Sequence, residues 1–156
     1  MKQRENILAG KGEPFSLGEG LDFMRLLWAI DHAIQSKSKS MEAGLGVTGL
    51  QRLVIRIVGR FPGIPAGQLA EILQIHPSTL TGVVKRLERR KLIRRRTDAR
   101  DGRRLLLGLT ARGNDLDVDA EGSIESAVQG VLAGIPRNQL EATQAVLTRL
   151  AQSLKE

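Results

Sequence analysis

The sequence predicts a mainly α-helical protein that carries one small β-hairpin. Apolar aliphatic residues recur at helical spacing over most of the 156 residues, which is typical of helices with one buried face. Only between residues 93 and 109 does the pattern change to two short extended runs. Aromatic residues make up 3% of the chain, so its core has to be built from aliphatic side chains, as in many helical proteins.

A long first helix is predicted from about Ser16 to Met41. We expect it to fade through the polar segment 36–40 and to be broken by Gly44 and Gly46. Its apolar stripe consists of Leu17, Leu21, Met24, Leu27, Trp28, Ile30 and Ile34.

Three shorter helices are predicted next. Thr48 is suited to cap a second helix, which residues 61–63 (Phe-Pro-Gly) should end. Pro65 fits the first turn of a short third helix, where its missing N–H costs nothing. Pro77 opens a fourth helix that runs to about Arg90.

The remaining elements are a hairpin and two helices. Residues 93–96 and 103–109 are predicted strands around a charged turn. Thr110 should cap one continuous fifth helix, whose face carries Leu116, Ala120, Ile124, Ala127 and Val131. Gly134 and Pro136 separate it from a sixth helix with a coiled-coil-like seam of Leu140, Thr143, Leu147, Leu150 and Leu154.

Positive charge is concentrated in one segment. Between Lys85 and Arg112 there are twelve Lys or Arg residues and three acids, whereas the rest of the chain has twelve bases and fourteen acids. A concentrated basic surface on a nearly neutral body indicates a polyanionic partner.

Several classes of protein are excluded by composition. The absence of cysteine excludes disulfides and thiolate metal sites, and His32 and His76 have no accompanying ligand cluster, so no metal or cofactor is expected. There is no phosphate-binding loop or catalytic triad pattern, so we expect no enzyme. No apolar run is long enough to span a membrane, and the first residues lack the hydrophobic core of a signal peptide. A cytoplasmic location is therefore expected.

The order of helix, short helix, turn, helix and hairpin predicts a winged helix-turn-helix. Its fourth helix would enter the DNA major groove and present Ser78, Thr79, Thr81, Lys85 and Arg86. Arg100 at the hairpin tip is suited to the minor groove, where negative potential is concentrated. Arg96, Arg103 and Arg104 add charge to this wing, while Asp98 and Asp101 shape its turn. We also expect Arg103 to pair with Asp98 across the hairpin.

Residues 69–113 resemble the MarR family (multiple antibiotic resistance regulators). The matching motifs are Leu-Ala-Glu at 69–71, Pro-Ser-Thr-Leu-Thr at 77–81, Val-Lys-Arg-Leu-Glu-Arg at 84–89, Asp-Ala-Arg-Asp-Gly-Arg at 98–103 and Leu-Gly-Leu-Thr-Ala-Arg-Gly at 107–113. Three positions depart from the family pattern: Gln74 and Lys91 replace usual glycines, and His76 replaces a usual capping serine. Gln and Lys can adopt left-handed backbone at modest cost, so the fold should persist.

The resemblance implies a sequence-specific, double-stranded-DNA-binding transcriptional regulator, most often a repressor. It implies an obligate homodimer on a pseudo-palindromic operator, with half-sites about one helical turn apart. The corresponding organisation is a flexible arm at 1–15 with Lys2, Arg4 and Lys11, a dimerisation helix and loop at 16–47, a DNA-binding lobe at 48–110 and C-terminal dimerisation helices at 111–156.

Many members of this family release DNA when a small, frequently aromatic anion binds between the dimer helices and the lobe. Arg25, Trp28, His32 and Arg52 are candidates to line such an effector pocket, because Trp and Arg suit aromatic carboxylates. A packed core or dimer contact is the simpler role for Trp28.

Two other functions fit a winged helix. One is a module that binds proteins rather than DNA, against which the basic density counts. The other is a nonspecific architectural DNA-binding protein, which competition between a cognate site and random DNA would distinguish.

Overall fold

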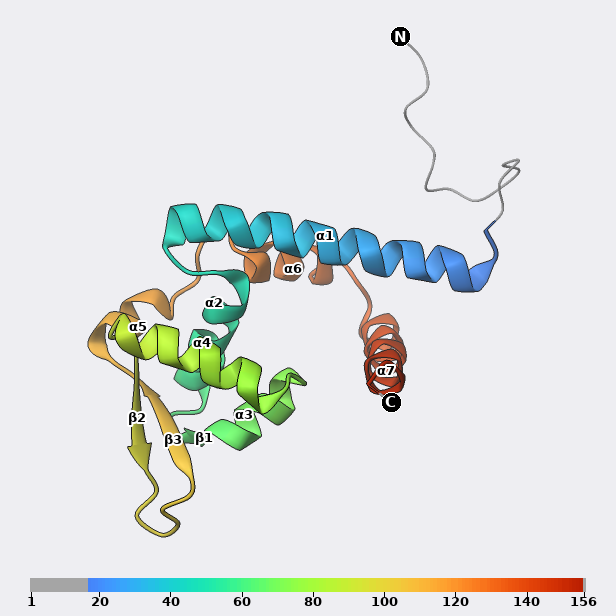
Figure 1. The fold of residues 1–156 in the computed structure, drawn as a ribbon. Coiled ribbons are helices and arrows are strands. Elements are labelled where there is room, and N and C mark those ends of the chain that lie inside the picture. Colours follow the sequence, from blue (N-terminus) through green and yellow to red (C-terminus); the bar gives the residue numbers. More distant parts are fainter. Residues whose placement is uncertain (1–16, 156) are drawn as a thin grey trace. The chain divides into compact units, whose positions relative to one another are not determined.

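The computed structural model describes residues 17–155 and is mainly helical with one small antiparallel sheet (Figure 1), as predicted. The helices are α1 (Glu19–Leu45), α2 (Gly49–Arg60), α3 (Ala66–Leu73), α4 (Pro77–Arg89), α5 (Ala111–Leu116), α6 (Ile124–Leu132) and α7 (Arg137–Ser153). The strands are β1 (Ile64–Pro65), β2 (Ile93–Thr97) and β3 (Leu105–Leu109). The chain divides into two compact units, the first ending at Ser36 and the second beginning at Lys37. The predicted arm at 1–15, with its three bases, lies outside the described residues.

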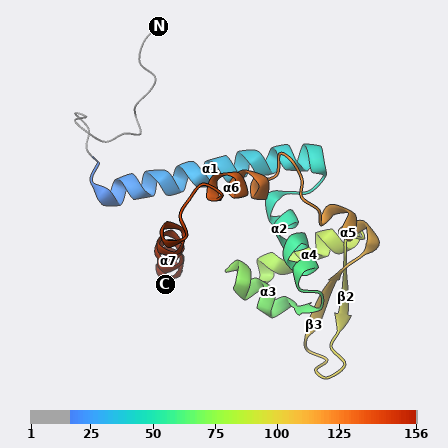
Figure 2. The ribbon, with the colours of Figure 1, turned by 180° about the vertical axis from the view of Figure 1, so that it is seen from behind.

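A lobe formed by α2 to α5 and the three strands contains the hydrophobic core. Its fully buried side chains come from several elements and include Ile55, Leu69, Leu87, Ile93 and Leu107. The strand order is β1-β3-β2, with all pairs antiparallel. Both opposite views show the tip between β2 and β3 extending beyond the helices of the lobe (Figures 1 and 2). This tip is therefore free to reach a partner that lies against the lobe.

The short strand β1 was not predicted. Ile64 pairs with Leu107 in β3, and the Gly63 N–H donates to the Leu107 carbonyl at 2.8 Å. Pro65, predicted within the first turn of a helix, instead ends this strand and occupies the N-cap position of α3. The hairpin is therefore anchored to the lobe by a third strand that is too short to show an alternating pattern.

Helix α1 continues through the polar segment at 36–40, so the predicted fading of the helix there is wrong. Ser38 in this segment accepts a hydrogen bond from the Gly49 N–H at 2.8 Å, and Met41 is buried. This hydrogen bond to the start of α2 and the burial of Met41 compensate for the weak helix propensity of the serines. The helix ends before Gly46, whose φ of 72° is left-handed backbone that favours glycine.

The predicted single fifth helix is wrong, because α5 and α6 are separated by a loop at 117–123. The buried side chain of Arg52 donates to the carbonyls of Leu116 at 2.9 Å and Val118 at 2.6 Å, and it forms an ion pair with Glu125 in α6. In a continuous helix these carbonyls would accept backbone N–H groups four residues later. Gly122, at φ 77°, then turns the chain before Ser123 caps α6.

The acids of this loop hold it against α2. Arg56 pairs with Asp117 and with Asp119, each at 2.9 Å. Gly59 allows the close approach, since a Cβ there would lie 1.8 Å from an Asp117 carboxylate oxygen. Asp117 and Asp119 therefore lie in the loop that follows α5 and not on a helix.

Helices α6 and α7 contribute no buried residue within the described chain. α7 corresponds to the predicted sixth helix. Its apolar seam includes Leu147, which is 41% exposed, and Leu154, which is 79% exposed. Among residues 17–155, no helix has both the length and the apolar content needed to cross a membrane.

Candidate nucleic-acid interface

Helix α4 has a buried face and a polar face on opposite sides. Leu80, Val83, Val84 and Leu87 face the core. The predicted contact residues are all exposed, and they are Ser78, Thr79, Thr81, Lys85 and Arg86. The structure therefore brings these five side chains together on the accessible side of one helix, with a hydroxyl-rich start and a basic second half.

His76 caps the N-terminus of α4. Its Nδ1 accepts a hydrogen bond from the Ser78 N–H at 3.2 Å and lies 2.7 Å from the Ser78 Oγ. Pro77 follows at the first helical position, where no N–H is required. The imidazole nitrogen therefore performs the role of the usual serine oxygen.

The two non-glycine turn residues adopt left-handed backbone, as the sequence required. Gln74, at φ 53°, ends α3, and Lys91, at φ 58°, follows α4. The Lys91 N–H donates to the Glu88 carbonyl at 2.8 Å and the Leu92 N–H to the Leu87 carbonyl at 2.9 Å. These bonds satisfy the last carbonyls of the helix and direct the chain into β2.

Two aspartates shape the wing tip through the backbone. Asp98 accepts from the Arg100 N–H and Asp101 from the Arg103 N–H, each at 3.0 Å. The Arg103 side chain does not pair with Asp98, so that expected ion pair is wrong; the carboxylates are already used by main-chain donors of the turn. This arrangement leaves the Arg100, Arg103 and Arg104 side chains exposed and without an acidic partner among the described residues.

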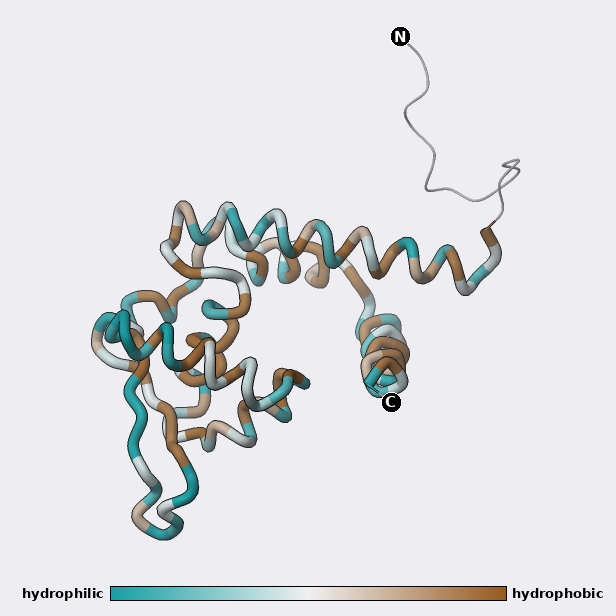
Figure 3. The backbone as a smooth tube through the Cα atoms, viewed as in Figure 1, coloured by the Kyte–Doolittle hydropathy of each residue, from teal (hydrophilic) through white to brown (hydrophobic). Residues whose placement is uncertain are grey.

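Strand β2 has arginines on both faces. Arg95 points toward α4 and pairs with Glu88 at 2.5 Å, whereas Arg94 and Arg96 lie on the other side of the strand. The residues of β2 and of the tip are mostly hydrophilic, whereas those of β3 are mostly hydrophobic (Figure 3). Within the described chain, Arg95 is the one base between Lys85 and Arg112 that forms an ion pair. The positive potential of this segment is therefore left unneutralised.

The four candidate effector residues are not alike. Arg25, Trp28 and His32 belong to the first unit, where Trp28 is 67% exposed and Arg25 lies 3.6 Å from Asp22. Trp28 is thus not a core residue of the isolated chain. Arg52 is 1% exposed and its guanidinium is fully engaged with α6 and the preceding loop. Arg52 therefore has a structural role within the described chain. Among the described residues, no group of three or more acids or histidines is placed to hold a metal ion.

A helical pair with an exposed polar helix, followed by a basic hairpin on a three-stranded sheet, defines the winged helix-turn-helix class of proteins. A family model described as MarR family matches residues 45–104, from the end of α1 to the wing. The chain is also 26% identical to the HTH-type transcriptional repressor Rv2887 of Mycobacterium tuberculosis over 125 residues, which cover 80% of this chain and 90% of that protein.

Two further relatives extend the similarity. The HTH-type transcriptional regulator TtmR of Methylorubrum extorquens is 28% identical over 155 residues, 98% of this chain and 76% of that protein. MepR of S. aureus, in a crystal structure of its DNA complex, superimposes with a TM-score of 0.70 at 26% identity, covering 85% of this chain and 97% of that chain. The chain is thus similar to MarR-family proteins, with the family model matching residues 45–104, in agreement with the resemblance that the sequence motifs indicated. Both curated relatives are named as transcriptional regulators and neither as an enzyme.

Proposed function

We propose that this protein is a homodimeric, sequence-specific repressor that binds double-stranded DNA and is released by a small effector. The observation that carries the proposal is the joint surface of α4 and the wing. At this surface, two separate elements of one lobe present hydroxyl groups and Lys and Arg side chains without acidic partners to solvent. The related MepR has been crystallised bound to DNA, which supports the same partner for this chain.

Helix α4 is proposed to lie in the major groove. Ser78, Thr79 and Thr81 would contact base edges or phosphates near the helix start, and Lys85 and Arg86 would reach guanine or phosphate. The Thr81 hydroxyl donates to the Pro77 carbonyl at 2.9 Å, so its oxygen remains available as an acceptor. The amino groups of cytosine and adenine are the base donors that such an acceptor could meet in the major groove.

The wing is proposed to supply the second contact. Arg100 would enter the minor groove, because it lies at the tip between two turns that hold the backbone in shape. Arg96, Arg103 and Arg104 would contact phosphates on either side of it. A protein-interaction module would have no need for so many Lys and Arg side chains without acidic partners on two elements. DNA is therefore the favoured partner.

Dimerisation is proposed to cover the apolar surfaces of the flanking segments at 16–47 and 111–156. Eight large hydrophobic side chains between residues 17 and 34 of the described chain, such as Trp28, are exposed, and so is much of the α7 seam. Exposed apolar area of this kind indicates an interface. Sedimentation should give a dimer at micromolar concentration, and a monomer there would contradict the proposal.

A charge on the α7 seam should weaken the dimer. Leu147→Asp is expected to raise the dimer dissociation constant at least about tenfold, since an unpaired carboxylate would be buried at the interface. Ala145→Asp adds the same charge on the opposite side of α7 and serves as the control. Equal sedimentation behaviour of the two variants would remove α7 from the interface.

The effector is proposed to be a small anion, frequently aromatic in this family, recognised by Arg25, Trp28 and His32 on α1. The chemistry of these side chains supports the proposal, because a cation and an exposed indole together suit an aromatic carboxylate. Trp28 also remains a candidate dimer contact.

The first experiment is selection of genomic fragments by the purified protein, followed by competition against random DNA at fixed salt. Recovery of a pseudo-palindrome that binds roughly 10³ or more times tighter than random DNA would establish a specific regulator. Equal affinity for all fragments would indicate an architectural protein. Absence of binding would favour the protein-interaction module.

A further inference from the structure

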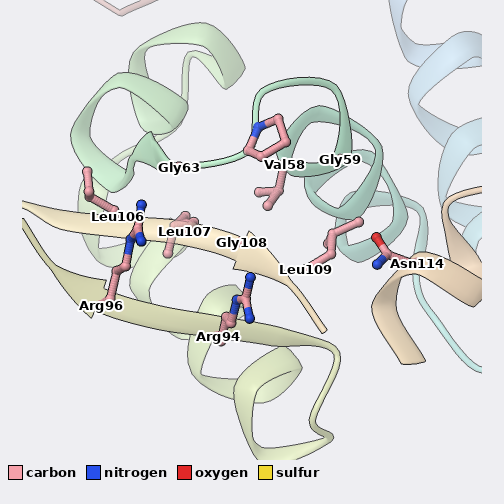
Figure 4. A pocket seen from close by; sticks show the side chains of 11 residues that line it. Val58, Gly59, Gly63, Arg94, Arg96, Leu106, Leu107, Gly108, Leu109 and Asn114 are labelled. Carbon is pink, nitrogen blue, oxygen red and sulfur yellow. The ribbon is translucent and has the colours of Figure 1, made fainter. Parts of the chain in front are cut away.

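A cavity of about 470 Å³ lies on the side of the wing sheet away from α4. It is bounded by β2 and β3, by the end of α2 and the turn after it, and by α5. Its walls are mainly apolar, from Val58, Pro62, Leu106, Leu107 and Leu109. Figure 4 shows the Arg94 and Arg96 side chains extending from β2 on this side of the sheet. The combination is an apolar hollow with two cations at one wall.

Gly108 keeps the cavity open. It stands opposite Arg94 in the β2–β3 pairing, and a Cβ there would lie 3.3 Å from the Arg94 Nε. A glycine inside a strand weakens the strand, and it commonly marks a bulge or a place where another group approaches the backbone. The pairing of β2 and β3 is regular through Gly108, so no bulge accounts for it. The absence of a side chain at Gly108 leaves this side of β3 open beside the Arg94 side chain.

The two arginines are uncompensated. No acid lines the cavity, and neither Arg94 nor Arg96 forms an ion pair in the described structure. Asp117, which lies close to Gly59 at the cavity wall, is occupied by Arg56. Arg95 on the same strand shows the contrast, because it faces the other way and has Glu88 as its partner. The cavity therefore has an unsatisfied preference for negative charge.

We propose that this cavity binds a small carboxylic acid with an apolar body, at a site separate from the effector residues on α1. Guanidinium groups match carboxylates through paired hydrogen bonds, and the aliphatic walls favour a hydrocarbon or aromatic ring. The volume lies within the range of small-molecule sites. Asn114 on α5, also at the wall, adds a polar amide to the cavity.

Binding at this site would act on the wing. Arg96 is shared between the cavity and the proposed phosphate contacts, so a carboxylate that draws its guanidinium inward would remove it from DNA. This coupling rests on the proposed function, whereas the ligand site itself does not.

The test uses benzoate as the probe and the full chain without DNA. Titration followed by amide chemical shifts should show saturable changes at Gly63, Gly108 and Asn114, with a dissociation constant of about 1 mM or tighter. Benzamide has the same ring without the charge and acetate has the charge without the ring, so both should bind at least about tenfold more weakly.

Three variants locate the site. The double variant Arg94→Gln/Arg96→Gln should weaken benzoate binding at least about tenfold. Arg95→Gln removes the same charge from the opposite face of the same strand and should leave binding unchanged. Gly108→Val keeps both arginines but fills the hollow, and it should abolish the shifts; the added Cβ would meet the Arg94 side chain, 3.3 Å from its Nε. A folded amide spectrum checks each variant.

The outcomes separate the two proposals. Absence of saturable shifts at these residues up to about 10 mM benzoate, or equal binding by all three variants, would overturn the cavity proposal, whatever the protein does with DNA. Saturable binding lost in the double variant and in Gly108→Val would support it, even for a protein that failed to select an operator.

Discussion

Two regions of the molecule differ in how far their apolar side chains are buried. These side chains form a buried core in the lobe from α2 to α5, and most of them are exposed on the helices α1, α6 and α7. Within the described chain, every buried hydrophobic residue except Met41 lies between Val47 and Leu109. Helices α6 and α7 bury none, and side chains such as Val131, 66% exposed, remain open to solvent. The lobe thus completes its own core, and the flanking helices leave theirs uncovered.

This difference separates two kinds of stability. Burial of apolar area contributes roughly 25 cal/mol per Å² only where water is excluded, and the single chain excludes it mainly inside the lobe. The lobe is therefore stabilised by its own core, whereas the proposed second copy would be needed to cover the flanking helices. Substitutions in the two regions should therefore respond differently to protein concentration.

The largest effect is expected in the core of the lobe. Leu87→Ala removes a fully buried side chain of α4 and should lower the free energy of unfolding by about 2–5 kcal/mol, through lost burial and the cavity that remains. Denaturant unfolding at fixed protein concentration measures it. Ile72→Ala, at a position 49% exposed on α3, is the control and should change stability by less than about 0.5 kcal/mol. Similar losses for both would contradict the assigned core.

The junction between the two regions should be nearly as sensitive. Arg52→Gln leaves Glu125 and two loop carbonyls without their cation and should cost about 3 kcal/mol, because the Arg52 side chain is 2% exposed. Arg56→Gln breaks two partly exposed pairs, with Asp117 and Asp119, and should cost less than about 1 kcal/mol. Equal effects in denaturant unfolding would show that α6 is not held through Arg52.

The wing should affect binding without affecting folding. Arg100→Ala is expected to weaken operator binding by about 1–3 kcal/mol, because its side chain is the proposed minor-groove contact and makes no ion pair within the described chain. Titration of operator DNA measures the loss and thermal unfolding checks the fold. Ala99→Gly, beside it in the same turn, retains the charge and serves as the control. An unchanged affinity for Arg100→Ala would remove the tip from the interface.

The smallest effect concerns the end of α4. Lys91→Gly should raise the free energy of unfolding by about 0.5 kcal/mol, since a φ of 58° is strained for lysine and the gain is partly offset by glycine's greater unfolded-state entropy. Arg90→Gly, at φ −84°, has no such strain to relieve and should lower stability. A loss for both variants would show that Lys91 contributes through its side chain.

Local signals in the sequence determined α2, α4 and the wing. Thr48 caps α2 through a reciprocal pair of hydrogen bonds with Gln51, and Pro77 marks the start of α4. The charged turn at 97–102 and the basic segment were also visible in the sequence, so the proposed interface could be named before any coordinates. Each of these features depends on residues a few positions apart.

Only the tertiary structure decided the features that depend on distant partners. β1 exists because Ile64 pairs with Leu107, and two residues carry no periodicity of their own. The fifth helix breaks because Arg52 and Arg56, on α2, bind the carbonyls and acids of residues 116–119. The cavity beside Gly108 likewise requires α2 and α5 to meet the sheet. Helix and cap signals act within one turn, whereas these contacts join groups more than forty residues apart, which no local pattern can encode.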